Sequence, residues 1–231
     1  MSGATERLQP AVAARQDGRS RALDLLWLET LGRITGRAAH EVKGALNGVS
    51  VNLEVVRSRA ERPDAPASAV SRFAESAAQQ LESLIRMNEA LLVLARPARE
   101  PADVGLTLIR LTALLGPSTA AEGGALELDE GVRRRAGDTT TTVRGNATRL
   151  ALAAALLPAL EHKGVTTCRL EVGDTIVVAV SSSAGGTLEV PAAITDALAG
   201  AGVRLGATPE GCSLTFPRTG ASDETKGSND A

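Results

Sequence analysis

The residues best suited to chemistry in this sequence are His40 and Glu41, which lie in the run AAHEVKGALNGV at residues 38–49. A neutral imidazole is a usable nucleophile near neutral pH, and an adjacent carboxylate can hold one tautomer or accept a proton. A single surface histidine in an arbitrary chain is usually only a solvated polar residue. The surroundings of His40 must therefore decide between a solvated residue and a phosphorylatable one.

His40 falls inside a long segment whose apolar residues recur at steps of three and four. Such a pattern marks one buried stripe of an amphipathic helix. With roughly 100° of rotation per residue, His40 lies about 175° from the centre of that stripe and is predicted to face solvent. The stripe consists of Leu31, Ile34, Ala38, Val42, Ala45, Val49, Leu53 and Val56.

Two glycines, Gly36 and Gly44, lie one turn before and one turn after His40 on the same face. Each glycine costs the helix about 1 kcal/mol relative to alanine. In return, no side chain lies directly above or below the imidazole, so another protein surface can approach it closely. Arg37 and Lys43, on or near this face, are expected to steer an acidic partner. The candidate catalytic residues are therefore His40 and Glu41, and the candidate partner-binding residues are Gly36, Arg37, Lys43, Gly44 and Asn47.

Composition limits the remaining possibilities. The chain has 231 residues, a net charge of −2 and only 1% aromatic residues, and no basic run contains interleaved aromatics, so nucleic-acid binding is not expected. No apolar run of the roughly 18–20 residues that span a membrane is found, and the N-terminus has no signal-peptide pattern. We expect a cytoplasmic protein without membrane contact, in which Cys168 and Cys212 are reduced core residues.

The elements that position His40 are two helices. The first is expected to run from about residue 21 to residue 61 or 62, where prolines at 63 and 66 end it, and the second from 67 to 95. The two helices form an antiparallel hairpin, and each has one apolar stripe that a hairpin alone covers poorly. A second hairpin would complete a four-helix bundle, so the sequence predicts a homodimer.

Shorter, mixed elements follow a linker at residues 96–101. They comprise a helix over 104–115, strands near 126–128 and 139–143, and a helix capped by Asn146 that reaches about residue 163. Two strands at 166–172 and 175–181 form a hairpin, a short helix follows at 192–201, and strands at 203–205 and 213–216 close the sheet. The expected domains are a disordered arm (1–19), a helical hairpin (20–96), an α/β domain (97–217) and a disordered tail (218–231).

The run from His40 to Leu46, followed by VNLE at 51–54, resembles the phospho-acceptor box of two-component histidine kinases. Ala45 replaces the usual proline of that box, and Gly44 stands where many members carry Asn or Thr. The resemblance implies that His40 is a phospho-acceptor. It also implies that the α/β domain corresponds to the ATP-binding domain of these kinases, an α/β sandwich. The segment that most clearly matches this domain is VRGNATRL, residues 143–150.

That second domain departs from the family at the positions that bind nucleotide. Pro158 replaces the asparagine that coordinates Mg²⁺, Ser181 replaces the aspartate that reads adenine, and the glycine-rich lid is missing. The resemblance therefore implies a degenerate ATPase-like domain and no cofactor. It is closest in kind to dimeric histidine phosphotransferases, whose receiver-domain partners supply the Mg²⁺.

Three functions remain open at this point. The leading hypothesis is phosphotransfer in a phosphorelay, in which His40 accepts a phosphoryl group from one response-regulator receiver and donates it to another. A divergent histidine kinase that autophosphorylates on His40 is the alternative within the family. A dimeric adaptor, a pseudokinase that only binds response regulators, is the non-enzymatic alternative.

Overall fold

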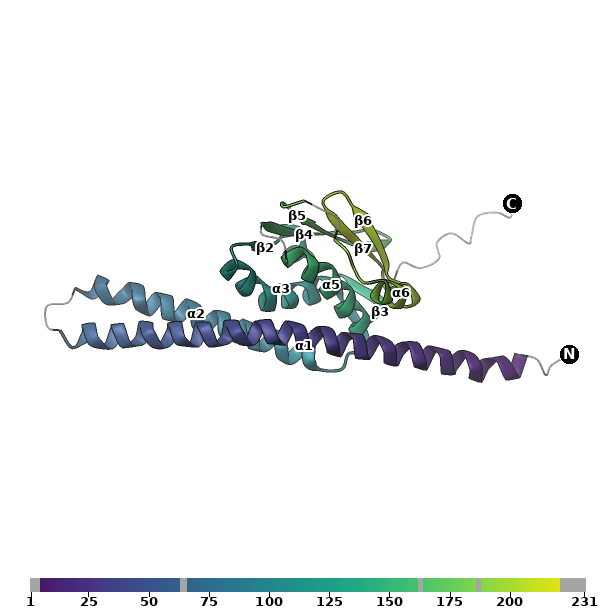
Figure 1. Cartoon of the computed structure of the whole chain (residues 1–231), viewed down its shortest axis with the longest axis horizontal. Coiled ribbons are helices and arrows are strands. Elements are labelled where there is room, and N and C mark those ends of the chain that lie inside the picture. The colour runs from purple at the N-terminus through teal and green to yellow at the C-terminus, as the bar shows by residue number, and fades with distance from the viewer. Residues whose placement is uncertain (1–4, 63–65, 162–163, 186–187, 221–231) are drawn as a thin grey trace.

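A computed structural model describes residues 5–62, 66–161, 164–185 and 188–220 of the chain. Two long helices form an antiparallel hairpin, and the rest of the chain folds into an α/β domain that lies against one part of it (Figure 1). In chain order the elements are α1 (Thr5–Ala60), α2 (Ala67–Ala95), β1 (Pro101–Asp103), α3 (Val104–Ala121), β2 (Ala125–Leu128), α4 (Glu130–Arg135), β3 (Thr140–Arg144), α5 (Gly145–Leu160), β4 (Val165–Val172), β5 (Thr175–Ser182), α6 (Ala192–Gly200), β6 (Arg204–Thr208) and β7 (Gly211–Pro217).

The hairpin agrees with the predicted bounds except at its start. α1 begins at Thr5, so it includes residues that the sequence assigned to a disordered arm at 1–19. The reason is composition, since residues 5–19 include three Ala, three Arg and two Gln, which are good helix formers even without an apolar stripe. Far along the hairpin, the Asn52 side-chain amide donates to Ser76 Oγ (3.1 Å) and Gln80 Oε1 (3.3 Å), which joins the two helices.

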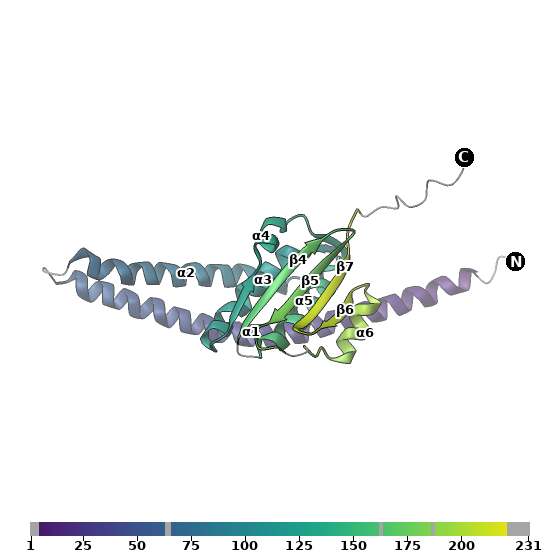
Figure 2. The same ribbon diagram turned by 90° about the horizontal axis from the view of Figure 1, so that it is seen from above.

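The main sheet has five strands in the order β2-β4-β5-β7-β6, with β2 parallel to β4 and every other pair antiparallel. A separate two-stranded sheet pairs β1 with β3. Figure 2 shows the five strands lying above helices α3 and α5, with α6 beside β6. The described part of the chain thus has a helical N-terminal region followed by an α/β sheet domain.

Helix α5 is the centre of the molecule, between the sheet and α1. All its residues are buried except Pro158, which is half-buried. A helix that is apolar all round needs cover on every side. The cover comes from strands β5 and β7 on one side and from α1 on the other (Figure 1).

A single hydrophobic core joins the hairpin to the α/β domain. Trp27 and Ile34 of α1 and Leu94 of α2 are at most 2% exposed and belong to the same cluster as the buried residues of α3, α5 and the sheet. This part of the hairpin is therefore built into the α/β domain. The other part, toward the α1–α2 turn, projects away from it (Figure 2).

Helix α3 is longer than predicted and continues past residue 115 to Ala121, with Pro117 inside its last turns. At 18 residues and a mean hydropathy of 1.3 it has the length and composition to cross a membrane, which the shorter predicted helix did not. Half of that window is buried inside the fold, as is usual for the core helix of a domain.

The chain end at 218–220 is also ordered, contrary to the predicted tail boundary. Arg218 forms a bridge with Thr141, and the Thr219 amide donates to the Thr140 carbonyl at 3.0 Å. Residues 1–4 of the predicted arm and 221–231 of the predicted tail lie outside the described residues.

Candidate functional site around His40

His40 lies where α1 leaves the α/β domain. Ala38, at 3% exposure, is the last buried residue of α1, and every later residue of the helix is half-buried or exposed. The His40 side chain is exposed, as its position opposite the apolar stripe predicted. The imidazole is therefore presented to solvent beside the domain on a rigid helical segment.

The two glycines that flank His40 leave free space around it. Gly36 and Gly44 are exposed, and a Cβ atom placed on either would meet no atom within 4 Å. Lys43 and Asn47, which helical geometry places on the same side of α1, are exposed as well. A flat partner surface can therefore come close to His40 without displacing any side chain of this chain.

Glu41 is turned away from His40 by about 100° and is half-buried. Within the described residues, neither side chain makes a hydrogen bond or an ion pair. The role of Glu41 in orienting the imidazole stays a prediction.

Two arginines, one and two helical turns before His40, form ion pairs with the α/β domain. Arg33 pairs with Glu161 at 3.8 Å, just after α5 ends, and Arg37 pairs with Glu122 at 3.9 Å, just after α3 ends. Such exposed pairs contribute little to stability, about 0–1 kcal/mol each. They show that the ends of α3 and α5 lie alongside α1 immediately before His40. Arg37, which was predicted to steer a partner, thus forms an ion pair within the protein itself.

A buried arginine fixes the domain to the hairpin. Arg149 of α5 donates to the carbonyls of Val93 (3.0 Å), Leu94 (3.1 Å) and Arg96 (2.6 Å), where α2 ends. Its guanidinium also lies over the Trp27 ring of α1, 5.9 Å from the centroid. Burial, and after it the neighbouring charge of Arg110, lowers the pKa of Arg149 below its ordinary value. The carbonyls at the negative end of the α2 dipole keep this cation in place.

Asn146 makes a second connection, which corrects the prediction that it caps α5. The helix begins at Gly145 with Arg144 as its N-cap and no side-chain cap. The Asn146 amide instead donates to Asp24 Oδ1 of α1 (2.8 Å), and its oxygen accepts from the Ala98 amide in the linker (3.2 Å). The linker passes so close that a Cβ on Gly145 would lie 2.5 Å from the Ala98 Cβ. A tertiary contact has replaced the local cap.

The two positions matched to nucleotide-binding residues of histidine kinases, Pro158 and Ser181, carry no acidic or amide side chain. Pro158 lies inside the last turns of α5. On β5, Ser181 is half-buried and the next residue, Ser182, is buried, and the match of Ser181 to the family's aspartate stays a prediction. Ser182 is 4% exposed and accepts a hydrogen bond from the Ala184 amide at 3.3 Å.

Comparison with known proteins gives structural likeness only. The chain is similar to the Acinetobacter baumannii histidine kinase AdeS, with a TM-score of 0.40 and 12% identity over 78% of this chain and 98% of that chain. It is also similar to full-length ShkA in complex with AMPPNP, with a TM-score of 0.35 and 15% identity, covering 81% of this chain and 46% of ShkA. No protein-family model matches the sequence, and no curated protein is significantly similar to it. Likeness at this level carries no function, which has to be argued from the residues.

Sequence reasoning missed the contacts that place the domain beside His40. Arg149 is the only charged residue in the 16-residue helix α5, and that isolation was a usable signal. A charge in the middle of an apolar helix needs partners from another element. The Arg33–Glu161 and Arg37–Glu122 pairs had no such signal, because exposed charges are common on helices.

Proposed function

We propose that this protein is a histidine phosphotransferase of a two-component phosphorelay, with His40 as the phospho-acceptor. The observation that carries the proposal is the exposed His40 between two glycines, in a run that resembles a phospho-acceptor box. A receiver domain that presents a phosphorylated aspartate needs this kind of open access.

In the transfer step, an unprotonated imidazole nitrogen of His40 attacks the phosphorus of an aspartyl phosphate in line. An N–P bond forms as the P–O bond to the aspartate breaks, and the carboxylate leaves with the electron pair. The receiver supplies the Mg²⁺ and its acidic pocket. This chain supplies the nucleophile, the helix that holds it, and positive charge from Lys43 that favours an acidic partner.

The same residues bear on the kinase alternative. A histidine kinase must bring bound ATP to its own histidine. Pro158 has no side-chain ligand for magnesium, and Ser181 has a hydroxyl where the family has the aspartate that reads adenine. Both features favour phosphate delivery by another protein.

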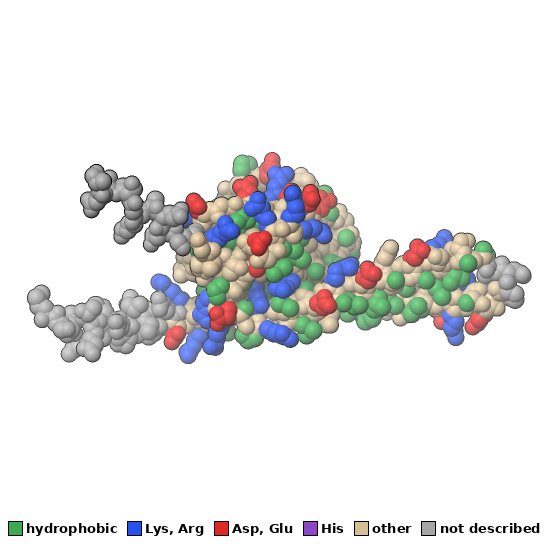
Figure 3. All heavy atoms as spheres, turned by 180° about the vertical axis from the view of Figure 1, so that it is seen from behind, with side chains coloured by type: hydrophobic (Ala, Val, Ile, Leu, Met, Phe, Trp, Pro, Cys, Tyr) green, Lys and Arg blue, Asp and Glu red, His purple; other side chains and the backbone are tan. Residues whose placement is uncertain are grey.

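The homodimer is part of the proposal and is supported by an apolar groove on the hairpin. The groove has a volume of about 540 Å³ and lies between α1 and α2, with Leu114 of α3 in its wall. Leu46, Leu81 and Ile85 line it and are 49–52% exposed. Hydrophobic side chains gather along the projecting part of the hairpin in Figure 3 as well. A second copy of the hairpin would cover this surface and complete a four-helix bundle.

The proposal is tested by mixing the full chain with a phosphorylated receiver and following the phosphoryl group. Appearance of label on this chain supports phosphotransfer. Label acquired directly from Mg·ATP would establish the kinase instead. Receiver binding without any label would establish the adaptor.

A further inference from the structure

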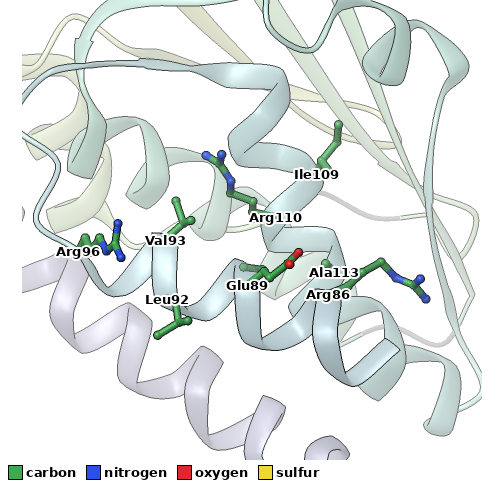
Figure 4. Close-up of a pocket in the computed structure, with 9 residues that line it drawn as sticks. Arg86, Glu89, Leu92, Val93, Arg96, Ile109, Arg110 and Ala113 are labelled. Atoms are coloured by element: carbon green, nitrogen blue, oxygen red, sulfur yellow. The ribbon is translucent and has the colours of Figure 1, made fainter. Parts of the chain in front are cut away.

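A second concave surface lies between α2 and α3 and has no α1 residue in its lining. Its volume is about 490 Å³, within the range of about 300–1,000 Å³ that is common for small-molecule sites. Val93 of α2 and Ile109 and Ala113 of α3 give it an apolar floor, as Figure 4 shows. We call it the α2–α3 groove.

The charges around this groove are mainly positive. In Figure 4, Arg96 and Arg110 extend toward the end of the groove near Val93, whereas Arg86 stands at the opposite end and points away. Arg86 lies 3.8 Å from Glu82. Within the described part of the chain, Arg96 and Arg110 form no ion pair, and Glu89 is the single acidic residue of the lining. One end of the groove thus holds two cations without a counter-ion.

Arg149 adds a third positive charge behind that end. Its guanidinium is bound to the carbonyls of Val93 and Arg96, and the like charge of Arg110 contributes to the lowered pKa of Arg149. The carbonyls at the end of α2 offset only part of this charge. The like charges of Arg110 and Arg149 repel each other, and an anion held between Arg96 and Arg110 would reduce that repulsion.

We propose that the α2–α3 groove binds a small ligand that carries an oxyanion, a phosphate or a carboxylate, on an apolar body. The oxyanion lies between Arg96 and Arg110, since guanidinium groups bind both kinds of anion with paired hydrogen bonds. The apolar body rests on Val93, Ile109 and Ala113. Its lining does not include His40 or any other residue of α1, so the site stands independently of the phosphotransfer proposal.

The test uses calorimetry on the full chain at low ionic strength with three probes of similar shape: phenyl phosphate, benzoate and benzyl alcohol. The two anions distinguish a phosphate source from a carboxylate source, and the alcohol measures apolar binding alone. We expect at least one anion to bind, with an affinity that falls as salt is added.

Arg110→Gln should weaken the binding of that anion by about tenfold or more, because a charge-assisted hydrogen bond is lost. Arg86→Gln, whose side chain points away, and Arg99→Gln, an exposed linker control, should each keep the affinity within about twofold. Arg110 makes no hydrogen bond or ion pair in the described residues, so its variant is expected to fold normally.

Three results would overturn the proposal. The first is no binding of either anion at millimolar concentration. The second is equal binding of the alcohol and the anions, which indicates an apolar crevice only. The third is an equal loss of affinity in Arg110→Gln and Arg99→Gln, which indicates attraction by overall charge.

Discussion

At the scale of single residues, the glycines beside His40 are the feature most easily tested. Gly44→Leu keeps the imidazole but places a bulky side chain one turn away, in space that is empty in the structure. Because leucine is the better helix former, the variant should fold with equal stability or up to about 1 kcal/mol more. Transfer to and from a receiver should slow by about tenfold or more, equivalent to about 1.4 kcal/mol.

Gly18→Leu is the matched control for this variant, because Gly18 is also exposed on α1 with no atom near its Cβ position. It lies about six helical turns from His40. Rapid-mixing experiments with a labelled receiver measure the transfer rates of the Gly44→Leu and Gly18→Leu proteins. Equal rates in the Gly44→Leu and Gly18→Leu proteins would mean that the glycines are incidental to docking.

Arg149 is the second residue with a specific expectation. Arg149→Met removes the donors to three carbonyls of α2 and the contact with Trp27. We expect the free energy of unfolding in urea to fall by about 3 kcal/mol, since buried charge-assisted hydrogen bonds are lost. Arg110→Met removes only a like charge and should leave that free energy unchanged or raise it. Similar losses in both variants would contradict the role assigned to Arg149.

At the scale of elements, the central strands carry the two cysteines in one row. Cys168 of β4 and Cys212 of β7 both pair with Val180 of β5, and both thiols are buried and free. Burial raises the pKa of Cys168 to about 12 and of Cys212 to about 11. The predicted reduced core residues are confirmed.

These raised pKa values predict how stability depends on pH. Above about pH 9 the unfolded chain loses thiol protons that the folded chain keeps, so stability falls with rising pH by up to about 1.4 kcal/mol per unit for each thiol. Urea unfolding at several pH values should show a weaker fall in the Cys168→Ala, Cys212→Ala protein. Iodoacetamide at pH 8 should modify neither thiol until urea is added. Rapid alkylation of the folded protein would contradict the burial of these thiols.

The apolar groove of the hairpin gives the expectation for assembly. Wild-type protein should have twice the 23.7 kDa mass of one chain by light scattering at micromolar concentration. Leu46→Glu combined with Ile85→Glu puts charges into the groove and should give a folded monomer. Val51→Glu, at a more exposed apolar position outside the groove, should remain dimeric. A monomeric wild-type chain would contradict the four-helix bundle.

Apart from β1 and α4, which were not predicted, the order and type of the elements followed from the sequence, because local patterns determine them. The helix from 67 to 95 and the strand pair around Gly173 and Asp174 were predicted almost to the residue. Periodicity, proline breaks and turn residues are properties of short segments. The start of α1 and the cap of α5 were wrong, because helix propensity without a stripe and the Asn146–Asp24 contact lie outside such patterns.

At the scale of the whole molecule, the packing of the α/β domain against the hairpin could not be predicted from the sequence. It depends on residues far apart in the chain, such as Arg149 with Val93 and Arg33 with Glu161. The exposure of His40 was predictable, because it follows from helical geometry alone. Its position at the edge of the α/β domain was not. A partner that docks on His40 therefore meets α1 and the ends of α3 and α5 together.

The most direct measurement of the central claim is where the phosphoryl group goes. Candidate receiver domains are phosphorylated with acetyl phosphate, freed of the donor, and mixed with the full chain. Peptide mass spectrometry should place the phosphoryl group on His40. His40→Ala should acquire none while keeping the stability of wild type within about 0.5 kcal/mol, because the side chain faces water.

Ser58→Ala, an exposed position farther along α1, is the control and should be labelled as wild type is. The account predicts label on His40 of wild type and of Ser58→Ala, and none on His40→Ala. Label on another residue, or a wild-type chain that binds the phosphorylated receiver and stays unlabelled, would contradict it.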